Sequence, residues 1–324
     1  MQPDRGRFAA ETRFVFPGGG GADYIGVARQ FNPSREAGGV ERPMDPHPDH
    51  LARIAAALDR LAPPPLRVDL GSADCFHWSS ADNDLRPVPA PARTPLHLLA
   101  GMDMQKERLL ANTRRFAAGA RANNALLWGA RGTGKSALVK AVHAAVCAER
   151  PGLKLVEASG AAMGHMERLI GALRAQAHPV VLFLDDVSFA GGEDALKALK
   201  PALDGGVDAA SGRLIVYATS NRRQLVARDA RENTPDDLLW ADAAEEKLAL
   251  ADRFGLWLGF HAMDQSQYLA IVHAYAQHFA LPIAAPDLER EALLWLRTRG
   301  ARSGRTAYQF IIDLGGRFDI DVSF

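Results

Sequence analysis

Five short apolar runs mark the central part of the chain, which begins at about residue 96. Patterns typical of helices lie between the first four runs. Continuous apolar strands that alternate with helices are typical of a parallel sheet whose two faces are both covered. We therefore predict an α/β domain with a five-stranded parallel sheet over residues 96–262. The runs are residues 124–128, 153–157, 180–185, 213–219 and 256–260.

A different pattern begins at about residue 264, where the sequence indicates helices alone. Apolar residues in "DQSQYLAIVHAYAQHF" recur at helical spacing, which places them on one face of a helix. They are Tyr268, Ile271, Val272 and Tyr275. The segments "REALLWLRT" and "RTAYQFIIDL" follow with helical patterns of their own. We predict that residues 263–324 form a small helical lid after the sheet domain.

The first 95 residues are rich in proline and glycine, as in "FPGGGGADY", "APPP" and "PVPAPARTP". Such density breaks helices and strands, so we predict a loop-rich N-terminal segment over residues 1–95. One helix is predicted within it, over residues 49–62, with Asp49 as its N-cap and an apolar face that must pack on something. That face consists of Leu51, Ile54, Leu58 and Leu61.

The charge balance weakens one class of function. Lys plus Arg and Asp plus Glu number 38 each, so the formal net charge of the 324 residues is zero. A nucleic-acid binder usually carries a basic excess, which is absent from the chain as a whole, although a local basic patch stays open. A hydrophobic content of 48% suits an ordinary globular core.

Cysteine usage and the N-terminus bear on the compartment. Cys75 and Cys147 have no metal-ligand spacing, and we expect reduced thiols in a reducing compartment. The start "MQPDRGRFAA" lacks the apolar core of a signal peptide, and no window approaches the roughly 20 apolar residues of a membrane span. The expectation is a cytoplasmic protein without a membrane partner.

The strongest motif is "GARGTGKS", residues 129–136, which fits G-x-x-x-x-G-K-[ST] between a strand and a helix. Glycines let the backbone amides point at phosphate oxygens, and the following helix N-terminus favours anions. Lys135 would supply a charge to the β and γ phosphates, and the Ser136 hydroxyl would ligate Mg²⁺. The alternative is a plain Gly-rich turn, and the motif does not choose between ATP and GTP. The predicted nucleotide-binding residues are Gly129, Ala130, Arg131, Gly132, Thr133, Gly134, Lys135 and Ser136.

Two acids end another apolar run, in "LFLDDVSF". We expect Asp185, at the carboxyl end of a neighbouring parallel strand, to complete the Mg²⁺ shell with Ser136. Asp186 stands where a catalytic base would orient water toward the γ phosphate. Its side chain is one methylene shorter than the Glu that is common there, and Glu193 is the candidate replacement. The alternatives are a solvated strand end for Asp185 and a mere holding role for Asp186.

Three further polar residues are candidates. Asn221 follows the strand in "YATSNRR" and would touch the γ phosphate or the attacking water, unless it only caps a turn. Arg253 precedes the last apolar run and would reach a neighbouring subunit's nucleotide as an arginine finger, unless it makes an ordinary salt bridge. Arg305, with Arg302 as competitor, would sense the γ phosphate from the lid, unless it is a solvated arginine at a helix end.

The order of these landmarks resembles an AAA+ ATPase across residues 96–318. More narrowly, "NNALLWGARGTGKS", "DDVSF", "DRFGLWLGF" and "ARSGRTAYQF" resemble a bacterial AAA+ family catalogued as domain of unknown function, family 815. The resemblance implies an AAA+ fold with bound ATP and Mg²⁺, and Gly101 near the adenine. It also implies Asn221 as sensor 1, Arg253 as the finger and Arg305 as sensor 2.

The resulting expectation is an ATP hydrolase that assembles into a homo-oligomeric, hexamer-like ring. Its turnover would remodel an unknown protein or nucleic-acid partner. The alternatives are an ATP-gated binding module with little hydrolysis and a DNA-associated loader, against which the neutral charge argues. The segment "SGAAMGHMER" lacks the aromatic residue of peptide-threading rings, so we do not expect an unfoldase.

Overall fold

The computed structural model describes residues 48–61, 66, 68–80, 83–159, 166–187, 199, 202–203, 212–221 and 252–324. The chain separates into two compact units, Met1–Pro63 and Pro64–Phe324. Within the described residues, no helix has both the length and the apolar character that crossing a membrane requires. Each unit is described separately below.

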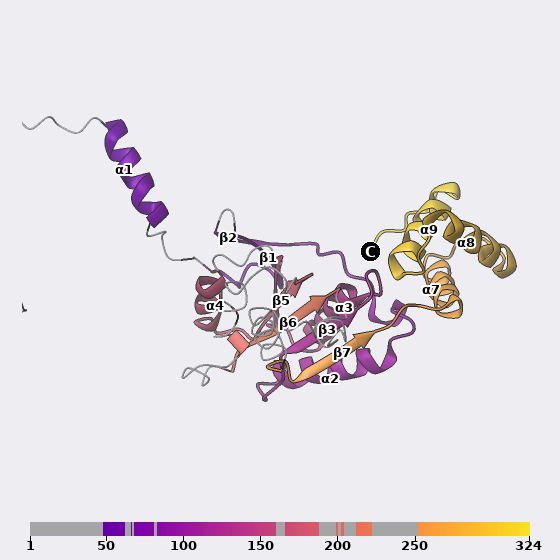
Figure 1. Ribbon diagram of the computed structural model, residues 1–324, viewed down its shortest axis with the longest axis horizontal. Coiled ribbons are helices and arrows are strands. Elements are labelled where there is room, and N and C mark those ends of the chain that lie inside the picture. The colour runs from indigo at the N-terminus through magenta and orange to yellow at the C-terminus, as the bar shows by residue number, and fades with distance from the viewer. Residues whose placement is uncertain are drawn as a thin grey trace, which may run out of the picture. The chain divides into compact units, whose positions relative to one another are not determined.

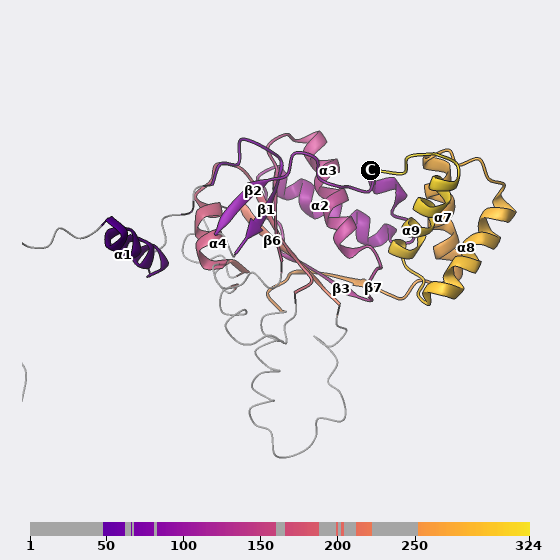
Figure 2. The same ribbon diagram turned by 90° about the horizontal axis from the view of Figure 1, so that it is seen from above.

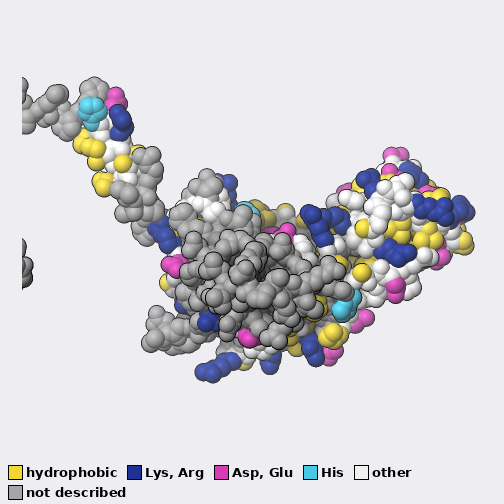
Figure 3. Space-filling model, in the orientation of Figure 1, with side chains coloured by type: hydrophobic (Ala, Val, Ile, Leu, Met, Phe, Trp, Pro, Cys, Tyr) yellow, Lys and Arg dark blue, Asp and Glu magenta, His cyan; other side chains and the backbone are white. Residues whose placement is uncertain are grey.

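The first unit contributes helix α1, Pro48–Leu61, which confirms the helix predicted over residues 49–62. Asp49 lies in the first turn of α1 rather than before it. The side chains of Leu51, Ile54 and Leu58 are 52%, 54% and 58% exposed. Figure 3 shows hydrophobic side chains gathered along this helix. The predicted packing partner for this apolar face stays a prediction.

The second unit is built on a seven-stranded sheet with the order β2-β1-β4-β5-β6-β3-β7 (Figure 1). The pairs β1–β4, β4–β5, β5–β6, β6–β3 and β3–β7 are parallel, and β1–β2 is antiparallel. The strands are β1 Cys75–Ser79, β2 Asp84–Pro87, β3 Ala125–Gly129, β4 Lys154–Ser159, β5 Val180–Asp185, β6 Leu214–Ser220 and β7 Leu256–Phe260.

The five predicted strands are confirmed as β3 to β7, but the predicted sheet lacked two strands. Strands β1 and β2 come from the Pro/Gly-rich segment that we expected to be loop-rich. Strand β1 is ordered by tertiary pairing, because Cys75 lies opposite Leu155 of β4 and both Phe76 and Trp78 become buried. The run "CFHWS" mixes polar and apolar residues and stands in Pro/Gly-rich surroundings, so it did not indicate a strand.

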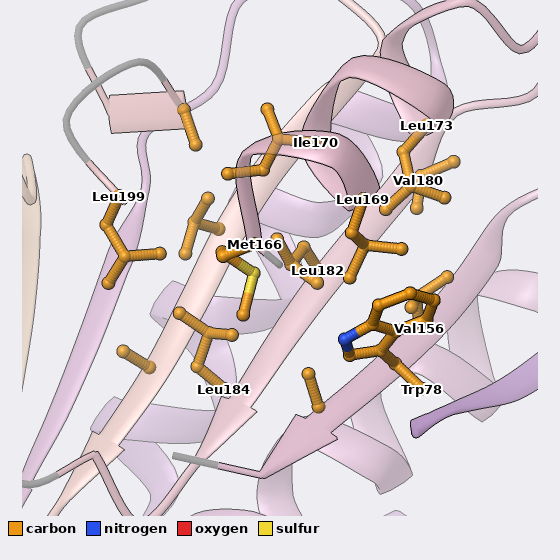
Figure 4. Packing of buried hydrophobic residues seen from close by; sticks show 14 of the residues in the cluster. Trp78, Val156, Met166, Leu169, Ile170, Leu173, Val180, Leu182, Leu184 and Leu199 are labelled. Atoms are coloured by element: carbon orange, nitrogen blue, oxygen red, sulfur yellow. The ribbon is translucent and has the colours of Figure 1, made fainter. Parts of the chain in front are cut away.

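The apolar runs are continuous because helices cover both faces of the sheet. Leu182 and Leu184 of β5 join a core with helix α4, Met166–Arg174. Figure 4 shows side chains of α4 packed over those of the sheet, among them Leu169 and Leu182. Phe183 points to the opposite core, with α2, Asp103–Ala117, and α3, Lys135–Glu149. Figure 2 shows α2 and α3 together on one side of the sheet.

The C-terminal part is helical, as predicted. Its helices are α7 Gln265–His278, α8 Ala285–Arg299 and α9 Gly304–Arg317. The predicted apolar face of α7 is buried in a separate core with residues of α8 and α9. Leu98, from the short 3-10 helix η1, Leu96–Leu98, joins this core and so ties the lid to the segment before α2. The boundaries at residues 96 and 263 stay predictions.

Candidate nucleotide site

The phosphate-loop motif occupies the turn from β3 into α3. Gly129 ends β3 with φ +137, and a Cβ there would lie 2.0 Å from the carbonyl oxygen of Phe260 in β7. Only glycine permits that approach. The amide of Ala130 donates to the same Phe260 oxygen at 3.2 Å. The end of β7 therefore fixes where the loop begins.

The lid contacts the middle of the loop. Gly132 has φ +79, and a Cβ there would lie 2.8 Å from the Cβ of Ser303. Ser303 is the N-cap of α9, and the next amide, that of Gly304, donates to the Gly132 oxygen at 3.0 Å. The N-terminus of α9 therefore lies directly on the loop. Arg305, in the first turn of α9, is exposed.

The Lys135 side chain lies inside the loop and is 5% exposed. Its Nζ donates to the carbonyl oxygens of Gly129 at 3.0 Å and Ala130 at 2.7 Å, and to Oδ1 of Asn221 at 3.0 Å. Burial lowers the pKa of Lys135, and the carboxylates of Asp186 and Asp185 oppose that shift. The ammonium is thus held by the loop backbone and Asn221, and its predicted contact with the β and γ phosphates stays a prediction.

Ser136 and Asp185 meet as predicted. The Ser136 hydroxyl donates to Oδ1 of Asp185 at 2.6 Å, and the Thr219 hydroxyl donates to the same oxygen at 2.7 Å. The predicted adjacency of β3, which leads into the phosphate loop, and β5, which ends at Asp185, was wrong, because β6 lies between them. Asp185 is the last residue of β5, so its carboxylate still reaches the start of α3.

Asp186 has an unusual backbone and a defined partner. Its φ is +54, in the left-handed region that Asp tolerates better than most residues. Its amide donates to Oγ1 of Thr219 at 2.8 Å, and its Oδ1 accepts from Nδ2 of Asn221 at 2.5 Å. Asn221 in turn accepts from Lys135, so Lys135, Asn221 and Asp186 form a continuous hydrogen-bonded chain.

The oxygen atoms here fit a magnesium ion. Mg²⁺ usually takes one or two carboxylates and keeps water and substrate phosphate oxygens as its other ligands. Ser136 and Asp185 offer one hydroxyl and one carboxylate beside the loop. Among the residues that the structure describes, no group of three or more His, Cys, Asp or Glu side chains could hold a metal ion, so a richer protein cage is not seen there.

The structure does not bring Arg253 to its own phosphate loop. Arg253 precedes β7 and is half-buried. Phe260, at the other end of β7, lies opposite Gly129, so the length of the strand, about 13 Å, lies between Arg253 and the loop. The predicted role of Arg253 as an arginine finger stays a prediction.

Gly101 and the two lid arginines lie near α7 or α9. Gly101, with φ +77, faces the side chain of Gln267 in α7, and its neighbour Met102 packs against the phosphate loop. Hydrogen bonds from the Gln267 amide and Ser266 lower the pKa of the Asp264 carboxylate, and the nearby charge of Arg302 adds to that shift. The proposed adenine and sensor roles of these residues stay predictions.

Some predicted positions lie outside the described residues. They are Glu193 and the Met163–His165 part of "SGAAMGHMER". The structure adds three residues that the sequence did not single out. Thr219 and Ser303 had weak signals, a hydroxyl near the end of an apolar strand and a serine before a predicted helix. Met102 carried no signal.

Three solved structures resemble this chain at low identity. The Thermotoga maritima RuvB Holliday junction branch migration motor is 14% identical, covers 69% of this chain and 74% of its own, and has a TM-score of 0.41. The FIGL-1 AAA domain in complex with ADP is 20% identical, covers 71% of this chain and 75% of its own, and has a TM-score of 0.46. The Aeropyrum pernix Orc1 protein in complex with DNA is 15% identical, covers 71% of this chain and 66% of its own, and has a TM-score of 0.49. Values this low say nothing about activity.

No curated protein matches the chain. A family model matches residues 71–318, from just before β1 to just beyond α9. Within that range lie the parallel sheet, the phosphate loop and the helical lid of an AAA+ P-loop NTPase fold. The family resemblance drawn from the sequence motifs is confirmed, and the chain belongs to the family described as "Protein of unknown function (DUF815)".

Proposed function

We propose that this protein binds ATP with Mg²⁺ and hydrolyses it. The observation that carries the proposal is the meeting of Lys135, Ser136 and two acids at the carboxyl ends of β3, β5 and β6. Ser136 is bonded to Asp185, and Lys135 is linked through Asn221 to Asp186. A cation, a hydroxyl and two carboxylates around a loop of amides are the groups that phosphoryl transfer to water requires.

Each side chain has a distinct task in this proposal. The loop amides and Lys135 hold the phosphates, while Ser136 and Asp185 hold the metal ion. Mg²⁺, when bound, would neutralise charge that develops on the phosphate oxygens. Asp186 accepts a hydrogen bond from the attacking water and so orients it, and Asn221 holds the Asp186 carboxylate in place. The choice of ATP over GTP rests on the family resemblance.

The proposal extends to assembly. Arg253 lies at the amino end of β7, away from its own loop, and an arginine there suits a contact across a subunit interface. We propose a homo-oligomeric ring in which Arg253 completes the site of the neighbouring chain. Turnover would then change the arrangement of subunits and remodel a partner whose identity is open.

One observation favours a second candidate, an ATP-gated binding module with little hydrolysis. The Asp186 carboxylate is engaged by Asn221, which is itself held by Lys135. A carboxylate that keeps this partner after ATP binds would hold the ligand without activating water. The two candidates share the binding site and differ in turnover.

The test combines steady-state ATP hydrolysis in the presence of Mg²⁺ with light scattering, with and without ATP. Turnover that accompanies a large assembly supports the hydrolase. ATP binding by a monomer without turnover favours the gated module. Absence of ATP binding, followed through the fluorescence of Trp128 in β3, would refute both.

A further inference from the structure

One buried hydroxyl connects the two acids of the site. Thr219, the next-to-last residue of β6, is 2% exposed. Its Oγ1 donates to Oδ1 of Asp185 at 2.7 Å and accepts from the amide of Asp186 at 2.8 Å. A hydroxyl has one proton to donate, so the direction of both bonds is fixed. Thr219 therefore orients the carboxylate of one acid and the backbone of the other.

A second bond from the same residue fixes the chain beyond Asp186. The amide of Val187 donates to the carbonyl oxygen of Thr219 at 2.8 Å. Two successive amides, those of Asp186 and Val187, are thus held by one residue of β6. The turn that follows β5 cannot change its backbone angles without breaking these bonds.

The conformation held in this way is the left-handed one at Asp186, with φ +54. Few residues other than Gly, Asn and Asp adopt it readily. In this conformation the Asp186 carboxylate reaches Asn221. The short Asp186 side chain therefore reaches Asn221 because its backbone is in the left-handed conformation.

We propose that Thr219 is a positioning residue for hydrolysis: it holds Asp186 in the left-handed conformation and so compensates for the short carboxylate. This inference rests on the proposed function, since it assigns Asp186 the task of orienting water. Thr219 itself touches neither substrate nor metal in this account, and it acts through the two acids.

Valine offers a matched replacement. It keeps the β-branched shape of Thr219 and replaces the hydroxyl by a methyl group, and β6 already carries the buried Val216. If Thr219 only fills space, Thr219→Val will leave turnover unchanged. Thr219→Ser makes the opposite change, since it keeps the hydroxyl and loses the methyl group.

The experiment measures turnover, ATP affinity and the melting temperature for wild type, Thr219→Val and Thr219→Ser. We expect Thr219→Val to lose at least about tenfold in kcat, equivalent to one lost hydrogen bond in the transition state, with ATP affinity nearly unchanged. Thr219→Ser should stay within a few-fold of wild type. Wild-type turnover by Thr219→Val, or equal loss in both variants, would overturn the positioning role.

A further variant keeps the test decisive if Thr219→Val does not fold. Asp186→Glu lengthens the side chain and disfavours the left-handed backbone, so we expect slower turnover than wild type. Turnover equal to or above wild type would show that the held conformation is unimportant. Where Thr219→Val folds, adding Asp186→Glu should recover part of its lost turnover, because a longer arm needs no turned backbone. No turnover in wild type would instead remove the proposed hydrolysis, and this inference with it.

Discussion

The two flanks of the phosphate loop are held in different ways. On the sheet flank, side chains bond to one another: Ser136 and Thr219 to Asp185, and Asn221 to Lys135 and Asp186. On the lid flank the contact is between backbones, from the Gly304 amide to the Gly132 oxygen. The lid arginines, Arg302 and Arg305, are exposed.

From this difference we expect the chemistry of the proposed hydrolase on the sheet flank and its movement on the lid flank. Lys135 and Thr219 are buried, so breaking their bonds would leave polar groups unsatisfied, whereas Asp186 and Asn221 are exposed. A contact through one helix N-terminus can open while α9 keeps its own N-cap. If the proposed nucleotide binding is right, we expect the sheet flank to keep its hydrogen bonds and the lid flank to follow the nucleotide state.

We expect the largest effect from removing Arg253, because the proposed site needs this side chain from a neighbouring copy of the chain. Arg253→Ala should bind ATP as wild type does and lose turnover by about 10³- to 10⁵-fold, the size of other arginine-finger losses. Mixing Arg253→Ala chains with inactive Asp185→Ala chains should restore some activity at composite interfaces. No restoration, with mixed assembly confirmed by native mass spectrometry, contradicts a role across the interface.

Lys135→Ala tests the contribution of the sheet flank to ATP binding. The phosphates lose a buried cation, so we expect ATP affinity to fall roughly 10- to 100-fold in a Trp128 fluorescence titration. Lys140→Ala is the matched control, because Lys140 lies on the same helix and pairs with Glu157 at 2.9 Å. Equal affinity in wild type and Lys135→Ala would remove the phosphate-loop interpretation.

Gly304→Pro tests the lid flank alone. Proline has no amide hydrogen to donate to Gly132, yet it suits the first position of a helix, and Ser303 before it is extended, with φ −154 and ψ 157. We expect ATP affinity to fall about threefold, the equivalent of one hydrogen bond of modest strength, with turnover at saturation retained.

Gly304→Ala is the control for this variant, because it keeps the amide and its Cβ would lie 3.7 Å from the Gly132 oxygen. It should behave as wild type. If Gly304→Pro stopped turnover as completely as a sheet-flank variant, the two flanks would not be separable.

Acid should weaken the scaffold under both flanks without altering turnover at neutral pH. Burial, with the charges of Arg93 and Lys154, lowers the pKa of His143 in α3 from 6.5 to about 4, and the charge of Asp74 opposes that shift. Between about pH 6.5 and pH 4, His143 therefore stays neutral in the native state but is protonated in the unfolded chain. The free energy of unfolding should fall from pH 6.5 toward pH 4, by at most about 3 kcal/mol. Denaturant titrations of His143→Gln should show a smaller fall in the free energy of unfolding between pH 6.5 and pH 4. A fall as large as that of wild type would mean that another group causes the acid sensitivity.

Much of the fold was predictable because its signals are local. Strands buried on both faces, such as Val180–Asp185, are continuous apolar runs, and the phosphate loop has fixed positions. The family assignment followed from long motif strings. Strands β1 and β2 were missed because the pairing of β1 with β4, and of β2 with β1, is not visible in "CFHWS" and its Pro/Gly-rich surroundings.

The site was predictable in its members and less so in its arrangement. Asp185, Ser136, Asn221 and Lys135 were expected together, and they lie together. Sequence order does not reveal that β6 separates β5 from β3. The left-handed backbone of Asp186 and the hydroxyl that holds it depend on tertiary contacts with Thr219, which no local pattern encodes.

The most direct test of the account concerns Asp186. Asp186→Asn keeps the size of the side chain and its tolerance of the left-handed backbone while removing the negative charge. We expect ATP binding with the affinity of wild type, a trapped ATP-loaded assembly and turnover reduced by about 10²- to 10⁴-fold in a steady-state assay with Mg²⁺. Turnover near the wild-type rate would contradict the account, because Asp186 would then only hold the site in shape.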